Sequence, residues 1–111
     1  MVIKPDIQGQ QAASDVALLN PLLQHRSRLG AMVLLSVQNA VSFVRLRELL
    51  NETDGNLGAQ LRKLEEADYV VVRKEFSERK PVSWYSITRS GHAALKTHLR
   101  AMESLIKAAQ L

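Results

Sequence analysis

Residues 53–67, Thr-Asp-Gly-Asn-Leu-Gly-Ala-Gln-Leu-Arg-Lys-Leu-Glu-Glu-Ala, decide the fold of this 111-residue chain. Leu57, Leu61 and Leu64 fall at helical spacing and form one apolar stripe, whereas most other positions are small, polar or charged. The threonine and aspartate that open the stretch are both good helix N-caps. The stretch therefore predicts an amphipathic helix that buries one narrow face.

Two further helices are predicted upstream. Residues 43–50 have apolar side chains at i, i+3 and i+7 behind an N-cap at Ser42. Residues 28–37 have a wide apolar face behind a predicted cap at Ser27. Between them, residues 40–42 predict a very short extended segment.

The residue composition changes downstream of residues 53–67. Residues 69–72 and 82–87 are rich in β-branched and aromatic side chains, as strands are. Residues 74–81 between them are mostly polar or charged, which predicts a hairpin with an exposed loop, the shape of a wing. Thr88 then caps a long last helix over about residues 88–110, in which apolar residues keep a helical period.

The N-terminal residues give a weaker signal. Residues 1–13 contain proline and glycine without a sustained apolar period, so we expect a flexible arm. A short helix is expected over residues 14–19, capped by its first or second residue, and Asn20 caps a second helical turn that begins at Pro21. Residues 14–111 have a length that suits a single domain.

The composition limits the class of protein. Hydrophobic residues make up 46% and charged residues 23% of the chain, values typical of a folded globular protein. The chain has no cysteine, which excludes disulfides and thiolate metal sites. No apolar run approaches the roughly 20 residues of a membrane span, and the start does not resemble a signal peptide, so we expect a cytoplasmic protein. The net charge of +4 favours a polyanionic partner.

Motifs of catalysis are missing from the sequence. His25, His92 and His98 are dispersed, and the last two have the wrong spacing for two metal ligands on one helix face. We find no phosphate-binding loop, dinucleotide fingerprint or nucleophile elbow. The expectation is a protein that is not an enzyme and needs no metal or cofactor.

The order of elements predicts a mainly α protein with a small β-wing, that is, a winged helix-turn-helix with a three-helix core and a long C-terminal helix. Its motifs together resemble the small winged-helix transcriptional regulators related to the MarR and ArsR groups. The motifs are Arg28-Leu29, Phe43 with Leu46-Arg47 and Leu50, residues 53–57, residues 61–67, Lys74-Glu75-Phe76, Arg79-Lys80-Pro81 and Thr88-Arg89-Ser90-Gly91.

The chain departs from the family pattern in two places. Gly58 and Ala59 stand where members commonly have a small hydroxyl residue and a polar residue, and Gln60 stands where many have histidine. These changes affect any base preference carried over from the family. Asp68 replaces the usual glycine that ends the helix in the left-handed conformation, which aspartate tolerates.

A helix-turn-helix protein inserts its second helix into the DNA major groove. In this sequence that helix is predicted over residues 53–67. A step of 100° per residue turns Asn56 and Gln60 outward. Their side-chain amides suit a bidentate contact with adenine; the alternative is that both are only solvated. Gly58 and Ala59 either let the helix approach DNA closely or reduce the contact. The candidate DNA-binding residues of this helix are Thr53, Asn56, Gly58, Ala59, Gln60, Arg62 and Lys63.

Other candidate residues would contact the DNA backbone or a neighbouring groove. Thr53 is either a helix cap or a phosphate ligand, and Arg62 and Lys63 suit phosphates better than bases. The remaining candidates are Ser42 and Arg45 near the preceding helix and Arg73, Lys74, Arg79 and Lys80 around the wing. The alternative is that these charges form an ordinary solvated surface.

The apolar stripe of the last helix is longer than a small domain needs to cover its core, and exposed stripes of this kind usually meet a partner. The predicted dimerisation residues are Leu18, Leu19, Leu95, Leu99, Met102 and Ile106. The alternative is that the stripe folds back onto its own domain.

These observations predict a sequence-specific transcriptional regulator that binds double-stranded DNA as a homodimer at a near-palindromic operator. The alternative is a winged-helix protein-interaction module without specific DNA binding. A small-molecule effector is compatible with the resemblance, but no residue of the sequence points to one.

Overall fold

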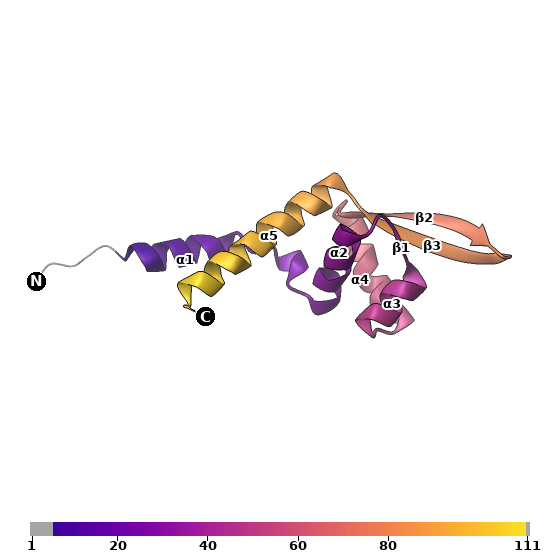
Figure 1. Cartoon of the computed structure of the whole chain (residues 1–111), viewed down its shortest axis with the longest axis horizontal. Coiled ribbons are helices and arrows are strands. Elements are labelled where there is room, and N and C mark those ends of the chain that lie inside the picture. The colour runs from indigo at the N-terminus through magenta and orange to yellow at the C-terminus, as the bar shows by residue number, and fades with distance from the viewer. Residues whose placement is uncertain (1–5, 111) are drawn as a thin grey trace, which may run out of the picture.

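Five α-helices and a small sheet make up the chain in the computed structural model, which describes residues 6–110 (Figure 1). The elements are α1 (Ile7–Ala17), the 3-10 turn η1 (Pro21–Leu23), α2 (Arg26–Val37), β1 (Val41–Ser42), α3 (Phe43–Leu50), α4 (Asp54–Glu66), β2 (Val70–Ser77), β3 (Lys80–Ile87) and α5 (Arg89–Ala108). This order confirms the predicted winged helix-turn-helix fold.

Local capping explains where the helices of the helix-turn-helix begin. The Ser42 hydroxyl accepts a hydrogen bond from the Arg45 amide, and the Thr53 hydroxyl accepts one from the Asn56 amide, as predicted. The predicted cap at Ser27 is wrong, because α2 begins two residues earlier, at Arg26, and His25 accepts from the Ser27 amide. Ser27 is instead buried against the turn between α3 and α4.

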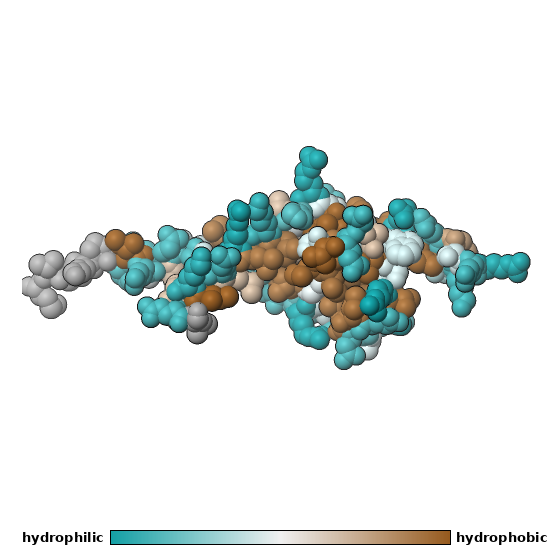
Figure 2. Space-filling model, in the orientation of Figure 1, coloured by the Kyte–Doolittle hydropathy of each residue, from teal (hydrophilic) through white to brown (hydrophobic). Residues whose placement is uncertain are grey.

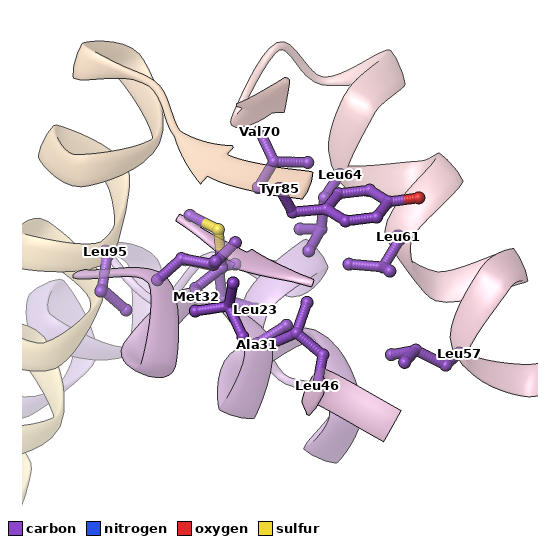
Figure 3. Close-up of a cluster of buried hydrophobic side chains, with 12 residues drawn as sticks. Leu23, Ala31, Met32, Leu46, Leu57, Leu61, Leu64, Val70, Tyr85 and Leu95 are labelled. Carbon is purple, nitrogen blue, oxygen red and sulfur yellow. The ribbon is translucent and has the colours of Figure 1, made fainter. Parts of the chain in front are cut away.

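The core lies where α2, α3 and α4 meet the sheet, and its side chains converge from all of these elements (Figure 3). Tyr85 packs into this core with Leu61 and Leu64 of α4. The buried cluster is Leu23, Ala31, Met32, Leu35, Val41, Leu46, Leu57, Leu61, Leu64, Val70, Tyr85 and Leu95. Leu95 was predicted to be a dimerisation residue, but it is only 3% exposed and belongs to the core of its own domain.

The wing is longer and more regular than the sequence predicted. The strand order is β1-β3-β2, with both pairs antiparallel, and β2 pairs with β3 from Val70↔Ile87 to Ser77↔Lys80. The expected loop over residues 74–81 is therefore wrong: only Glu78 and Arg79 form the turn. Both have positive φ, at 52° and 65°, which is the signature of a type I′ turn. The strands were not predicted over the charged residues because the side chains of an exposed hairpin need not be apolar.

The N-terminal prediction also needs correction. Residues 6–13 do not stand apart as an arm: α1 runs from Ile7 to Ala17 and packs along the C-terminal half of α5 (Figure 1). Its N-cap is Asp6, whose carboxylate accepts from the Gly9 amide at 2.9 Å, so Ser14 and Asp15 lie inside the helix. The tertiary contact with α5 stabilises a segment that has weak periodicity of its own. Residues 1–5 of the predicted arm lie outside the described residues.

A close backbone approach fixes the start of α5. Thr88 caps this helix, as predicted, by accepting from the Gly91 amide at 2.9 Å, and its hydroxyl donates to the Asp68 carbonyl at 2.6 Å. Gly91 is buried, and a Cβ there would lie 2.2 Å from the Tyr69 carbonyl oxygen. Asp68 ends the preceding helix with φ of 61°, the left-handed conformation expected at this position.

His98 joins α5 to the segment before α2. Its ring is 1% exposed, its Nδ1 accepts from the Asn20 amide at 2.9 Å, and the ring also hydrogen-bonds the Leu23 backbone. Burial lowers the pKa of His98 below its ordinary value of 6.5, and the Leu23 bond offsets part of this effect. An Nδ1 that accepts a hydrogen bond cannot carry a proton, so the junction requires neutral histidine.

No helix within residues 6–110 combines the length and the apolar character needed to cross a membrane.

We predict that Gly91→Ala lowers the free energy of unfolding by about 2 to 3 kcal/mol, because the new methyl group would overlap backbone rather than a movable side chain. Gly55→Ala is the matched control, since nothing lies within 4 Å of a Cβ at that position. The control should be as stable as the wild type or up to about 1 kcal/mol more stable. Urea denaturation measures both, and equal stability of the two variants would contradict the packing described here.

We predict that the stability of the protein falls as the pH drops below about 6.5, because the unfolded chain then binds a proton that folded His98 still excludes. Thermal melting between about pH 7.5 and 5.5 should show a smaller pH dependence in His98→Gln than in the wild type. His92→Gln, on the exposed side of α5, should keep the wild-type dependence. A His98→Gln profile parallel to the wild type would disprove the assignment.

Candidate nucleic-acid interface

The side of α4 that faces away from the core is largely exposed to solvent. Asn56, Arg62 and Lys63 are exposed, and Gly58 and Ala59 are half-buried. A Cβ at Gly58 would meet only the tip of the Arg62 side chain, at 3.9 Å. The glycine is therefore not required by packing, although glycine costs a helix about 1 kcal/mol relative to alanine. The surface that the sequence predicted to face outward is open to solvent over most of its length.

Gln60 is an exception, and its predicted place on the outer side is wrong. It is 8% exposed, and its Oε1 accepts from Arg28 Nη1 on α2 at 2.5 Å. Its Nε2 donates to Asn56 Oδ1 at 3.3 Å. Gln60 lies at the edge of the apolar stripe, where the neighbouring helix covers it, so its amide serves the protein rather than an open surface.

Glu52 is the residue that sequence reasoning missed. This carboxylate lies in the turn between α3 and α4 and accepts from the Ser27 hydroxyl, from Asn56 Nδ2 and, at 3.2 Å, from Arg26 Nη1. The hydrogen bond from Ser27 is the main reason that the pKa of Glu52 lies below its ordinary value, followed by the bond from Asn56. The sequence alone does not distinguish a glutamate that is hydrogen-bonded within the protein from one in a polar turn that is only solvated.

The hydrogen bonds form one connected network, which we call the α2–α4 network and define as Ser27, Arg28, Glu52, Asn56 and Gln60. It joins α2 to the first two turns of α4. The Asn56 amide is consequently held in one orientation, with its nitrogen toward Glu52 and its oxygen toward Gln60. A polar side chain oriented in this way is suited to selective hydrogen bonding with a ligand.

The candidates near α3 are partly engaged with the protein. The Ser42 hydroxyl oxygen caps α3, and Arg45 lies 3.5 Å from Glu48 in an exposed ion pair. Arg47 pairs with Asp54 at 2.7 Å, which raises the pKa of the arginine, mainly through the hydrogen bond. Exposed pairs of this kind contribute little to stability and exchange readily for another anion.

The wing carries four exposed cations, Arg73, Lys74, Arg79 and Lys80. Arg73 lies 2.7 Å from Glu75, whereas Lys74, Arg79 and Lys80 form no ion pair within residues 6–110, and neither do Arg62 and Lys63 of α4. Hydrophilic residues dominate the far end of the wing in Figure 2. The unpaired cations therefore lie on the exposed side of α4, a core helix, and on the projecting wing of the same domain.

Five of the six predicted dimerisation residues divide into two groups, and the sixth, Leu95, belongs to the core. Leu18, Leu99 and Ile106 are exposed, at 55%, 39% and 49%, and apolar surface appears along the arm formed by α1 and α5 in Figure 2. Leu19 and Met102 are half-buried and line a cavity of about 280 Å³ beside His98. Only the first group is exposed enough to contact a partner, because the second group is half-buried within its own domain.

The chemistry of this surface is that of binding. In the part of the chain that the structure describes, no three histidine, cysteine, aspartate or glutamate side chains come together in a way that would hold a metal ion. The α4 surface and the wing offer amides, small residues and cations.

Known proteins are similar to this chain in sequence and in fold. The family model for the winged helix DNA-binding domain matches residues 27–106. An uncharacterised protein of Methanocaldococcus jannaschii is 34% identical over 80 residues, which cover 72% of this chain and 87% of that protein.

The fold also matches solved structures. The transcriptional regulator homologue of Pyrococcus horikoshii superposes with a TM-score of 0.81 at 25% identity and covers 92% of this chain and 99% of its own. A mutant of MarR from Escherichia coli has a TM-score of 0.67 at 14% identity and covers 99% and 85%. The chain thus belongs to the winged-helix DNA-binding domain family and has the fold of MarR-type transcriptional regulators, which are not enzymes.

Proposed function

We propose that the protein is a sequence-specific regulator of transcription that binds double-stranded DNA as a homodimer at a near-palindromic operator. The observation that carries the proposal is the bare outer side of α4, where small residues and unpaired cations are held on a rigid helix. The family to which the chain belongs supports DNA as the partner.

The first half of α4 would make the base contacts. An α-helix fits the major groove, and an asparagine amide can hydrogen-bond both N6 and N7 of adenine. Asn56 is exposed and oriented by the α2–α4 network, which makes it the best candidate. Gly58 and Ala59 would let the helix axis lie close to the bases. Gln60 would act on Asn56 rather than on DNA, because it is buried and bonded to Arg28.

Phosphate contacts would supply most of the affinity. Arg62 and Lys63 follow the base-contacting turns of α4, and Thr53 stands at the positive end of the helix. Ser42 and Arg45 lie at the start of α3, and Arg73, Lys74, Arg79 and Lys80 belong to the wing. Binding by several such groups weakens steeply as the salt concentration rises. Each neutralised phosphate contributes about −0.9 to the slope of the logarithm of the binding constant against the logarithm of the salt concentration.

The arm formed by α1 and α5 would be the dimer interface. The radius of gyration is 17.8 Å, whereas a compact chain of this length would have roughly 13 Å. An arm that extends so far from the core exposes apolar residues, among them Leu18 and Ile106, that a second copy would cover. A two-fold pair would present two α4 helices about 34 Å apart, one turn of DNA.

We predict that selection from a random DNA pool recovers a near-palindrome, and that Arg62→Ala and Lys63→Ala each lower the slope of log Kd against log salt on that duplex by about 0.9. Lys96→Ala removes the same charge from the exposed side of α5 and is the matched control. Sedimentation should show that all three variants remain dimers. A wild type that binds no duplex, or binds all duplexes without salt dependence, would favour the protein-interaction alternative.

We predict that Gly58→Ala stabilises the fold by up to about 1 kcal/mol and weakens binding to the selected duplex, because the methyl group fills open space on the helix but would stand between α4 and the bases. Melting temperature and Kd are measured on the same sample. Lost binding in a more stable protein cannot result from unfolding. Unchanged binding would place the duplex away from this turn of α4.

A further inference from the structure

The wing carries an aromatic side chain that its own domain does not use. Phe76 is 79% exposed, more than any other large hydrophobic residue in the described part of the chain. Its position in β2 pairs directly with Pro81 in β3. The five residues of β2 from Arg73 onward are all exposed, so this end of the hairpin stands clear of the core.

Cations without an ion pair share the exposed end of the hairpin with this ring, beside the carboxylates Glu75 and Glu78. Lys74 precedes Phe76 by two residues and so lies on the same face of the strand, whereas Lys80 pairs with Ser77 and lies on the opposite face, and Arg79 is in the turn. An apolar ring among cations has the charge complementarity of a nucleic acid surface, where sugars and base edges lie between phosphates. A second apolar protein surface would be a poor match for these charges.

The turn beside Phe76 keeps charged residues at an energetic cost. Glu78 and Arg79 both adopt positive φ, at positions where asparagine and glycine are favoured. Left-handed conformations cost an ordinary residue about 1 to 2 kcal/mol. The turn thus retains Arg79 where a glycine would be more stable, which is consistent with a contact at the tip.

The length of the hairpin fits the spacing of the DNA grooves. Val72 is the last residue of β2 that is not fully exposed, and Phe76 lies four residues further, roughly 13 Å along the strand. With α4 in the major groove, the neighbouring minor groove lies about half a turn away, roughly 17 Å. The exposed part of the wing is of the same order as this separation, so it is long enough to reach DNA beside the half-site.

We propose that Phe76 packs as an apolar wedge into the minor groove flanking each half-site, with Lys74, Arg79 and Lys80 on the adjacent phosphates. This inference rests on the proposed function and adds a residue that contributes to sequence preference. The ring would lie against sugars and base edges in A·T-rich flanks, since the guanine 2-amino group projects into the minor groove and obstructs it.

The first test separates an apolar contact from a charged one. Binding of the selected duplex is measured over a range of salt concentrations for the wild type, Phe76→Ala and Lys74→Ala. Phe76→Ala should weaken binding about tenfold at every salt concentration without changing the slope, because an apolar side chain releases no counterions. Lys74→Ala should reduce the slope by about 0.9. Melting temperatures near the wild-type value for both variants would show that the fold is intact.

The second test locates the contact. Inosine in place of guanine removes the 2-amino group from the minor groove and leaves the major-groove groups unchanged. Wild-type protein should bind a duplex with I·C pairs in the flanks more tightly than one with G·C pairs, and Phe76→Ala should lose this preference. An equal preference in both proteins, or wild-type affinity in Phe76→Ala, would overturn the inference.

The outcome for Phe76 is distinguishable from that for the proposed function. If Arg62→Ala and Lys63→Ala weaken binding while Phe76→Ala does not, the regulator stands and the wedge is wrong. If the wild type binds no duplex at all, the proposed function itself fails.

Discussion

The burial of one narrow leucine stripe is the constraint on which the rest of the structure depends. Leu57, Leu61 and Leu64 of α4 are completely buried, and each fully buried leucine contributes about 1.5 to 3 kcal/mol. They pack in one cluster with residues of α2, α3 and the sheet, so the rotation of α4 about its own axis is fixed. The same rotation leaves Asn56, Arg62 and Lys63 outside. The exposed surface proposed to bind DNA is in this sense a consequence of the core.

The leucine stripe does not attach the first turns of α4 to α2, and the α2–α4 network does this. Glu52 accepts hydrogen bonds from Ser27 on one side and Asn56 on the other, so the turn between α3 and α4 is bound to α2. Arg28 extends the connection through Gln60. Hydrogen bonds from Ser27 and Asn56 favour the ionised form of the Glu52 carboxylate, which accounts for its lowered pKa. The polar groups at the base of the interface are thereby satisfied before any partner binds.

Two extensions leave the core, and they differ in chemistry. The wing, β2 and β3, is stabilised by strand pairing and exposes cations and one aromatic ring near its end. The arm of α1 and α5 is stabilised by helix packing and exposes aliphatic residues. Charged surface suits a polyanion, and aliphatic surface suits another apolar surface. The elongated molecule therefore separates the surface that we propose for DNA, toward one end, from the surface that we propose for a second copy, toward the other (Figure 1).

The sequence by itself determined the features that depend on residues a few positions apart. The caps at Ser42, Thr53 and Thr88, the leucine period of α4 and the order of elements are local, because a cap bonds an amide within three residues and a helical stripe repeats every three or four. Only the tertiary structure decided which edge of each stripe a neighbour covers. It buried Gln60 and Leu95, joined Ser27 to Glu52, extended α1 to Ile7 against α5 and carried the wing strands to a two-residue turn. Each of these depends on a partner that is distant in sequence or on a pairing register, and burial by a distant segment leaves no mark in the residues that it covers.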